Sequence, residues 1–316
     1  MTWNAHYWTI VPHALPRILR IKAPPSVPWA GKVMDPVTGS VNLSGRLRRK
    51  TGEGTLLLVV HGLGGHDSSV YALRAALAAE RAGLDCLRLN LRGADRSGED
   101  FYHAGLTQDI SAALASPALA SYRRILLLGY SLGGHVVLRY AVGEPDRRVG
   151  AAAAVCAPLD LDGCCASIDR PGLWLYRRYL LAGLKDIYAE VAARRPVPIP
   201  TGQARRIRTI RAWDDAIVAP RHGFKSAADY YARMSVGPRL RELKIPSLLV
   251  AAAHDPMVPW HTLRPWVEAA SPSPRLTVIK VKEGGHVGFP ARLHMEQDAP
   301  PGLESQVVGW LLGAAE

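Results

Sequence analysis

The sequence predicts an α/β fold in which a mostly parallel, doubly wound sheet of about eight strands carries a helical insertion. Short apolar runs that end in glycine-rich turns alternate with helical patterns, as in parallel strands joined by crossover helices. This alternation stops near residue 159 and resumes near residue 240, which indicates an insertion. With 316 residues, 48% of them hydrophobic, the chain is long enough to bury one large core.

The elements before the insertion follow in order along the chain. The alternating segment Ser40–Arg48 predicts an early antiparallel strand. The apolar runs after it do not alternate, which is typical of strands buried on both faces. They predict strands at Thr55–Gly62, Asp85–Asn90, Arg123–Ser131 and Gly150–Pro158. Helical patterns that end in glycine predict helices at Val70–Gly83 and Leu132–Gly143.

The insertion has a helical pattern of its own. Between Leu173 and Val191 the apolar positions recur at intervals of three and four, which predicts an amphipathic helix. Two more helices are predicted around Ile207–Trp213 and at Ser226–Met234. Beyond the insertion, the patterns predict strands at Pro246–Asp255 and Leu276–His286 and a closing helix at Leu303–Ala314.

These patterns divide the chain into three parts. We predict an N-terminal arm packed on the body over residues 1–32, an α/β core over 33–158 and 240–316, and a helical cap over 159–239. The N-terminal residues lack the basic start, apolar block and cleavage site of a signal peptide. We therefore expect a cytoplasmic protein whose four cysteines are reduced: Cys86, Cys156, Cys164 and Cys165.

The positive charge is concentrated in the predicted cap. The chain has 39 Lys and Arg against 27 Asp and Glu, a net charge of +12, and from Arg170 to Arg211 ten basic residues accompany two acidic ones. No recognisable DNA- or RNA-binding motif lies with them, so we predict no nucleic-acid partner. The basic face of the cap either contacts an anionic membrane surface or is simply a solvated helix face, and both interpretations remain. The oligomeric state is not predicted.

A Gly-x-Ser-x-Gly motif surrounds Ser131, between a predicted strand and a predicted helix. Such a turn holds the serine in a strained conformation, and Gly129 and Gly133 leave room that bulkier side chains would fill. The hydroxyl then lies at a helix N-terminus, where the helix dipole favours a developing negative charge. The motif predicts a nucleophile, the alternative being a glycine-rich turn without chemistry.

A serine nucleophile needs a base, and the base needs an orienting acid. Asp255 and His286 each end a predicted strand after Ser131, in the chain order Ser, Asp, His that this motif predicts. Because the carboxyl ends of parallel strands share one edge of the sheet, we predict that the three form a triad. The alternative acids are Asp160 and Asp162, whereas Asp214 and Asp215 in the cap are expected to form caps or salt bridges.

The oxyanion of such a reaction needs two backbone N–H donors. We predict one from Leu132, directly after the nucleophile, and the other from Leu63 in the turn "HGLGGHD". His61 and Gly62 open this turn and are predicted to contact substrate. The same turn lacks a close grouping of metal ligands, so no metal and no cofactor are predicted.

These residues resemble the α/β-hydrolase superfamily, and within it the YheT-like branch. Four segments beyond the serine motif carry the narrower resemblance: "NAHYWTI", "NLRGADRSGEDFYHAGLTQD", "WDDAIVAPRHGFKSAADYY", and the pair "HDPMVP" and "GGHVGF". The first departs from the branch in having Ala5 where proline is usual, and the third begins with Trp213 where phenylalanine is usual.

The resemblance implies a serine hydrolase of carboxylic esters, acting without a cofactor. It also implies that Tyr102, His103 and Asp215 either shape the site or support the fold. Trp213 and the apolar stripe of the cap favour an apolar, short- to medium-chain acyl group of a small ester or lipid. Two alternatives remain: acyl transfer to an alcohol, and a non-catalytic lipid- or RNA-binding protein with an idle triad.

Overall fold

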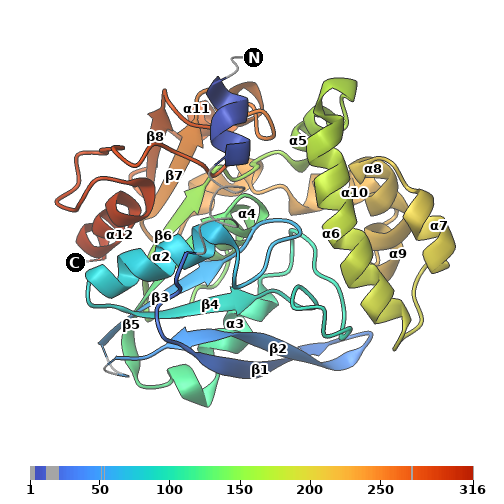
Figure 1. Ribbon diagram of the computed structural model, residues 1–316, viewed down its shortest axis with the longest axis horizontal. Helices are drawn as coiled ribbons and strands as arrows, with labels where there is room; N and C mark the ends of the chain where they lie inside the picture. The colour runs from blue at the N-terminus through green and yellow to red at the C-terminus, as the bar shows by residue number, and fades with distance from the viewer. Residues whose placement is uncertain (1–3, 12–20, 51, 53, 272, 316) are drawn as a thin grey trace.

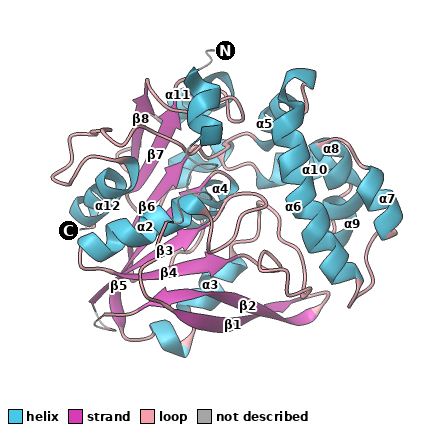
Figure 2. Ribbon diagram, viewed as in Figure 1, coloured by secondary structure: helices cyan, strands magenta, loops and turns pink. Residues whose placement is uncertain are grey.

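The computed structural model describes residues 4–11, 21–50, 52, 54–271 and 273–315. A sheet of eight strands forms its centre, in agreement with the predicted sheet of about eight strands, and the strand order is β1-β2-β4-β3-β5-β6-β7-β8 (Figures 1 and 2). The strands are β1 (Val27–Asp35), β2 (Gly39–Arg48), β3 (Gly54–Val60), β4 (Asp85–Asn90), β5 (Tyr122–Tyr130), β6 (Val149–Val155), β7 (Ser247–Ala252) and β8 (Leu276–Val281).

The sheet is mostly parallel. β1 pairs antiparallel with β2 and β2 antiparallel with β4, whereas β4, β3, β5, β6, β7 and β8 run parallel. The central strands are buried because helices cover both faces. One face packs against α2 (Val70–Arg81) and α12 (Leu303–Ala314), and the other against α3 (Gln108–Leu114), α4 (Leu132–Ala141) and α11 (Trp260–Ala270).

The helices of the insertion stand together on one side of the molecule, at the right of Figure 1. They are α5 (Leu161–Ile168), α6 (Trp174–Ala192), α7 (Thr201–Arg206), α8 (Ile210–Trp213), the π-helix η3 (Asp214–Val218), α9 (Ala219–His222) and α10 (Ala227–Met234). The 3-10 helix η2 (Pro171–Leu173) precedes α6, and η4 (Gly237–Glu242) follows α10, whereas η1 (Pro117–Leu119) lies in the core between α3 and β5. The apolar stripe of α6, including Leu180, Leu184 and Ile187, is buried against the body.

The N-terminal region differs from the predicted arm. Residues 4–11 form a helix, and β1 already begins at Val27, inside the segment assigned to the arm. Only Trp29, Val33 and Asp35 of β1 are buried, and Pro28 and other weak strand formers interrupt the pattern, so the strand was hidden in the sequence. Residues 12–20 of the predicted arm lie outside the described residues.

A buried cluster of charges links the core to the cap. The guanidinium of Arg92 binds Asp109 at 2.6 Å and Asp35 at 2.8 Å, and lies 3.5 Å from Asp100. Arg221 of α9 reaches the same Asp35 and Asp100, at 3.1 and 2.5 Å. Burial alone would raise the pKa of Asp35, but two backbone amides and these two guanidiniums hold it below its usual value. Cap and core therefore share one ionic cluster.

Candidate active site

Ser131 lies on the sharp turn between β5 and α4. Its backbone has φ +52° and ψ −121°, a conformation that L-residues rarely adopt, as the motif predicted. A Cβ on Gly129 would lie 2.2 Å from the carbonyl oxygen of Gly133, and one on Gly133 would lie 2.3 Å from that of His61. The turn therefore requires glycine on both sides of the serine, and it places the hydroxyl at the start of α4.

The structure brings Ser131, His286 and Asp255 into one hydrogen-bonded series. The Nε2 atom of His286 lies 2.9 Å from Ser131 Oγ, and its Nδ1 atom lies 2.9 Å from Asp255 Oδ2. The other carboxylate oxygen of Asp255 accepts hydrogen bonds from the amides of Met257 and Val258. Both Asp255 and His286 are buried, so water does not compete for these bonds.

The alternative acids have other partners. Asp160 caps α5 by accepting a hydrogen bond from the amide of Gly163. Asp162 is exposed and forms an ion pair with Arg211. The two ring nitrogens of His135, one turn into α4, lie 2.7 and 2.9 Å from the carbonyl oxygens of Pro158 and Met234, and burial lowers its pKa to about 4. Each of these groups has a structural role at its place in the fold.

The loop that carries His286 is held by distant residues. The amide of His286 donates to Thr9 Oγ1 at 2.9 Å, although 277 positions separate the two residues. The amide of Val287 donates to Cys156 Sγ, and both Val287 and Cys156 have φ +51°. Sequence reasoning missed the role of Thr9, although the segment "NAHYWTI" was part of the resemblance.

One group of possible metal ligands occurs among the described residues: Cys156, Asp255 and His286. It coincides with the hydrogen-bonded series above, in which both ring nitrogens of His286 already face Ser131 and Asp255. Burial raises the pKa of the Cys156 thiol, so a thiolate ligand is disfavoured. The chemistry of this donor set fits proton transfer better than it fits metal binding.

The two predicted oxyanion donors lie beside Ser131 in the same cavity wall. Leu132 begins α4, and Leu63 follows β3 in the turn where Gly62 donates to Tyr71 Oη and Gly64 donates to Tyr102 Oη. Neither Leu63 nor Leu132 donates a backbone hydrogen bond within the described part of the chain. Two tyrosines thus fix the amides on either side of Leu63 and leave that amide unused.

The predicted substrate contacts fall into two groups. Tyr102, His103 and Trp213 line the cavity that reaches Ser131. His61 and Gly62 do not line it, which corrects that expectation. The ring of His61 is buried and accepts from the Leu91 amide, and burial lowers its pKa to about 4. His61 therefore stabilises the turn from within the core and does not reach the cavity.

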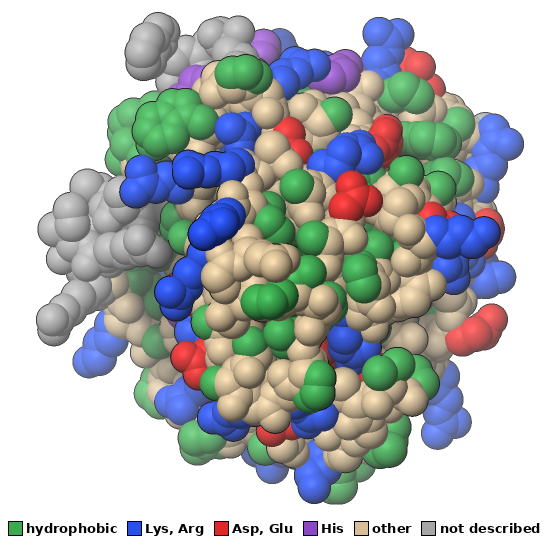
Figure 3. Space-filling model, turned by 90° about the vertical axis from the view of Figure 1, so that its right-hand side faces the viewer, with side chains coloured by type: hydrophobic (Ala, Val, Ile, Leu, Met, Phe, Trp, Pro, Cys, Tyr) green, Lys and Arg blue, Asp and Glu red, His purple; other side chains and the backbone are tan. Residues whose placement is uncertain are grey.

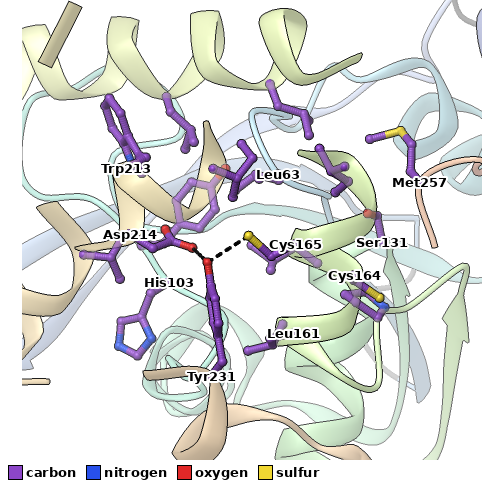
Figure 4. A pocket seen from close by; sticks show the side chains of 18 of the residues that line it. Leu63, His103, Ser131, Leu161, Cys164, Cys165, Trp213, Asp214, Tyr231 and Met257 are labelled. Carbon is purple, nitrogen blue, oxygen red and sulfur yellow. Dashed lines mark hydrogen bonds between the residues drawn. The ribbon is translucent and has the colours of Figure 1, made fainter. Parts of the chain in front are cut away.

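The cavity lies between the sheet edge and the cap (Figure 4). Its walls are mainly apolar, which suits a hydrocarbon chain. Asp214, expected to form a cap or a salt bridge, instead lines the cavity. Other lining residues that the sequence did not assign to the site are Leu161, Cys164, Cys165, Tyr231 and Met257. Asp215, which the resemblance suggested, does not line the cavity, whereas its neighbour Asp214 does.

Known proteins are similar to this chain in sequence. A family model described as "Alpha/beta hydrolase family" matches residues 57–299. The chain is 34% identical to "Putative esterase YheT" of Escherichia coli (strain K12), over 81% of this chain and 76% of that protein. It is 28% identical to "Phospholipase ABHD3" of Mus musculus over 74% of this chain, and the match spans 58% of that longer protein.

Solved structures agree in fold. An esterase of Pyrococcus furiosus, Pf2001, superposes with a TM-score of 0.56 at 16% identity, over 86% of this chain and 87% of that one. In the described residues, no helix is long and apolar enough to cross a membrane. The sheet, the serine turn and the two sequence matches agree, and we conclude that this chain belongs to the α/β-hydrolase family, in its YheT-like branch, and is a hydrolase.

Proposed function

We propose that this protein is a serine hydrolase that cleaves carboxylic esters through an acyl-enzyme. The observation that carries the proposal is the hydrogen-bonded series from Ser131 through His286 to Asp255, with 2.9 Å at each step. A base within this distance of a serine hydroxyl can take its proton, and a buried carboxylate behind it fixes the tautomer. Asp255 keeps this geometry because two amides hold its other oxygen.

In the proposed reaction, Ser131 Oγ attacks the ester carbonyl while His286 Nε2 takes the serine proton. The amides of Leu63 and Leu132 bind the oxyanion. His286 then gives the proton to the leaving alcohol, and the acyl group stays on Ser131. Water, activated by the same histidine, releases the acid and restores the serine. Asp255 stabilises the charged imidazole of His286 during both acylation and deacylation.

The proposed substrate is an ester with an apolar, short- to medium-chain acyl group. The apolar walls of the cavity support this, as do relatives named phospholipase and, in Saccharomyces cerevisiae, "Monoacylglycerol lipase". That yeast protein is 25% identical over 74% of this chain, and the match covers 54% of its own length. A lipid ester is therefore part of the proposal, with no cofactor required.

A fluorophosphonate probe and a chain-length series of p-nitrophenyl esters test the proposal. We expect covalent labelling at Ser131 and ester turnover, both lost in Ser131→Ala and retained in Ser111→Ala, an exposed serine of α3. Labelled, active Ser131→Ala would refute the assignment. If folded wild-type protein is neither labelled nor active, the binding protein with an idle triad is correct. Ester products formed with added alcohol would indicate acyl transfer.

Membrane contact through the cap belongs to the proposal as well. Trp174, Leu175, Arg178 and Tyr179 form an exposed stripe on the first turns of α6. The face shown in Figure 3 carries many Lys and Arg side chains and fewer Asp and Glu. In a sedimentation assay, the protein should pellet with anionic vesicles and should stay in the supernatant with neutral vesicles. Equal binding to both, or to neither, would remove membrane contact from the proposal.

The cytoplasm is the proposed compartment. All four cysteines are free thiols, and each of them is buried, in keeping with a reducing environment. Fractionation of producing cells checks the compartment, and recovery of the protein outside the cytoplasm would contradict it.

A further inference from the structure

Asp214 places a carboxyl group in the wall of an otherwise apolar cavity. It is the first residue of the π-helix η3, and only 9% of it is exposed. A π-turn is rare and often marks a functional site, because it shifts the side chains that follow a helix. Figure 4 shows Asp214 on the far side of the view from Ser131, with Leu63 and Cys165 between them.

Counting the partners that the described residues provide, one oxygen of this carboxyl is bonded and the other is not. The hydroxyl of Tyr231 donates to Asp214 Oδ2 at 2.6 Å and lies 3.1 Å from Cys165 Sγ. Among the described residues, no donor reaches Asp214 Oδ1. Figure 4 draws this group of three side chains, which come from η3, α10 and α5.

The neighbouring Asp215 shows what a structural carboxylate looks like in the same helix. Its Oδ1 accepts a hydrogen bond from the Ala227 amide at 2.6 Å, at the start of α10, and it does not line the cavity. Adjacent carboxylates therefore have different surroundings. Asp215 joins two cap segments, whereas Asp214 offers a free acceptor to whatever fills the cavity.

Within the described part of the chain, no cation forms an ion pair with Asp214. Arg211 is close enough to act on it through space, but its guanidinium pairs with Asp162. Burial therefore raises the pKa of Asp214 to about 7, helped by the charges of Asp169 and Asp215 and opposed by Tyr231 and Arg211. A ligand in the cavity that supplies a donor to Oδ1 gains a hydrogen bond to a strongly polar group in an otherwise apolar wall.

We propose that Asp214 and Tyr231 form a hydrogen-bonding subsite for a hydroxyl group on the acyl chain, so that hydroxyacyl esters are the preferred substrates. The inference rests on the proposed ester hydrolysis and adds the polar group that the cavity selects. A hydroxyl has one donor and matches the one free oxygen, Oδ1. An ammonium group has three donors, and the subsite offers them a single free acceptor.

The experiment uses matched pairs of p-nitrophenyl esters. Each pair has the same number of acyl carbons, with and without one hydroxyl, and the hydroxyl moves along the chain from pair to pair. The measured quantity is the ratio of kcat/KM within a pair. At one position we expect the wild-type protein to favour the hydroxylated ester by about 10- to 100-fold, the range for a hydrogen bond to a charged or strongly polar group.

Variants separate the subsite from general packing. Asp214→Leu should abolish or reverse the preference at that position, and kcat/KM is measured separately for both esters of the pair. Asp214→Asn, which keeps an acceptor oxygen, should retain part of the preference, and Tyr231→Phe should reduce it. Asp215→Asn is the matched control and should leave the ratio unchanged. The wild-type ratio decides by itself if Asp214→Leu does not fold.

The outcomes distinguish this inference from the proposed function. Ratios near one at every position, with plain esters hydrolysed and Ser131 labelled, overturn the subsite and leave ester hydrolysis standing. A preference that survives in Asp214→Leu also overturns it. If no ester is hydrolysed and Ser131 stays unlabelled, both proposals fall.

Discussion

The sheet edge and the cap both contribute polar groups to one cavity, but they hold those groups differently. At the sheet edge, Ser131, His286 and Asp255 bond one another, and backbone amides fix the carboxylate behind them. In the cap, Asp214 has one bonded oxygen and one free oxygen, among apolar neighbours. The first arrangement is complete without a ligand, and the second lacks one partner.

In the proposed function, the groups at the sheet edge carry out the reaction, and Asp214 in the cap selects the ester. A group that must act on any bound ester has to be in place before the substrate arrives, because preorganisation lowers the barrier. A group that selects among esters is better left with an unfilled hydrogen bond, because only a matching substrate satisfies it. We expect changes at the sheet edge to alter kcat, and changes in the cap to alter which ester is used.

The largest expected effect tests the sheet edge. Asp255→Asn should lower kcat about 10⁴-fold, since the amide would face His286 Nδ1 with the wrong hydrogen-bonding group. The control is Asp160→Asn, because asparagine also caps helices and Asp160 only caps α5. Steady-state kinetics on a short p-nitrophenyl ester measures both. An equal loss in the Asp160 variant would mean that the acid has been assigned wrongly.

The next effect compares the two guanidiniums of the shared ionic cluster. Arg92→Met should lower the free energy of unfolding by about 3–5 kcal/mol, because three buried carboxylates lose their main partner. Arg221→Met should cost less, since Arg92 still faces Asp35 and Asp100. Denaturant unfolding measures the stability. An equal loss of unfolding free energy in the two variants would contradict the prediction that Arg92 contributes more than Arg221.

A smaller effect concerns the pH dependence of the cap. Asp214, with a pKa near 7 in place of 3.8, should destabilise the fold increasingly as pH rises from about 4 to 7. Asp214→Asn removes this cost, so its stability relative to wild type should rise across that range, by on the order of 4 kcal/mol at most.

Denaturant unfolding at several pH values measures the free energy of unfolding of the variant and of the wild type. The buried histidines contribute equally to both values, so their contribution cancels in the difference. The groups that act on Asp214 are Tyr231, Asp169, Asp215 and Arg211, with Cys165 beside Tyr231. They are unchanged in the variant. A difference that does not vary with pH would show that Asp214 keeps an ordinary pKa.

The smallest effect concerns the support of the sheet edge by the N-terminal helix. Thr9→Val removes the acceptor for the His286 amide and should lower kcat several-fold, equivalent to about 1 kcal/mol. Thr9→Ser keeps the hydroxyl and should restore most of the rate. The thermal midpoint serves as a check on folding. Equal kinetics for valine and serine would mean that the loop holds His286 without Thr9.

The core could be predicted closely because its signals are local. Apolar runs such as Thr55–Gly62 and glycine-bounded turns such as that of Ser131 depend on nearby residues, and β3 and β5 follow them. β1 was missed because Pro28 and a mostly exposed pattern conceal it. In the cap, the long helix α6 was predicted, whereas the π-helix was not, since its extra residue per turn breaks the period of 3.6.

The sequence by itself determined the α/β architecture and the placement of Ser131, Asp255 and His286 at one edge of the sheet, because parallel strands bring their carboxyl ends together. The tertiary structure alone decided that Asp214 faces the cavity and Asp215 does not, that Tyr102 holds the turn beside Leu63, and that Thr9 reaches His286. These contacts join residues far apart in the chain. They depend on how whole helices pack and rotate, which no short stretch of sequence specifies.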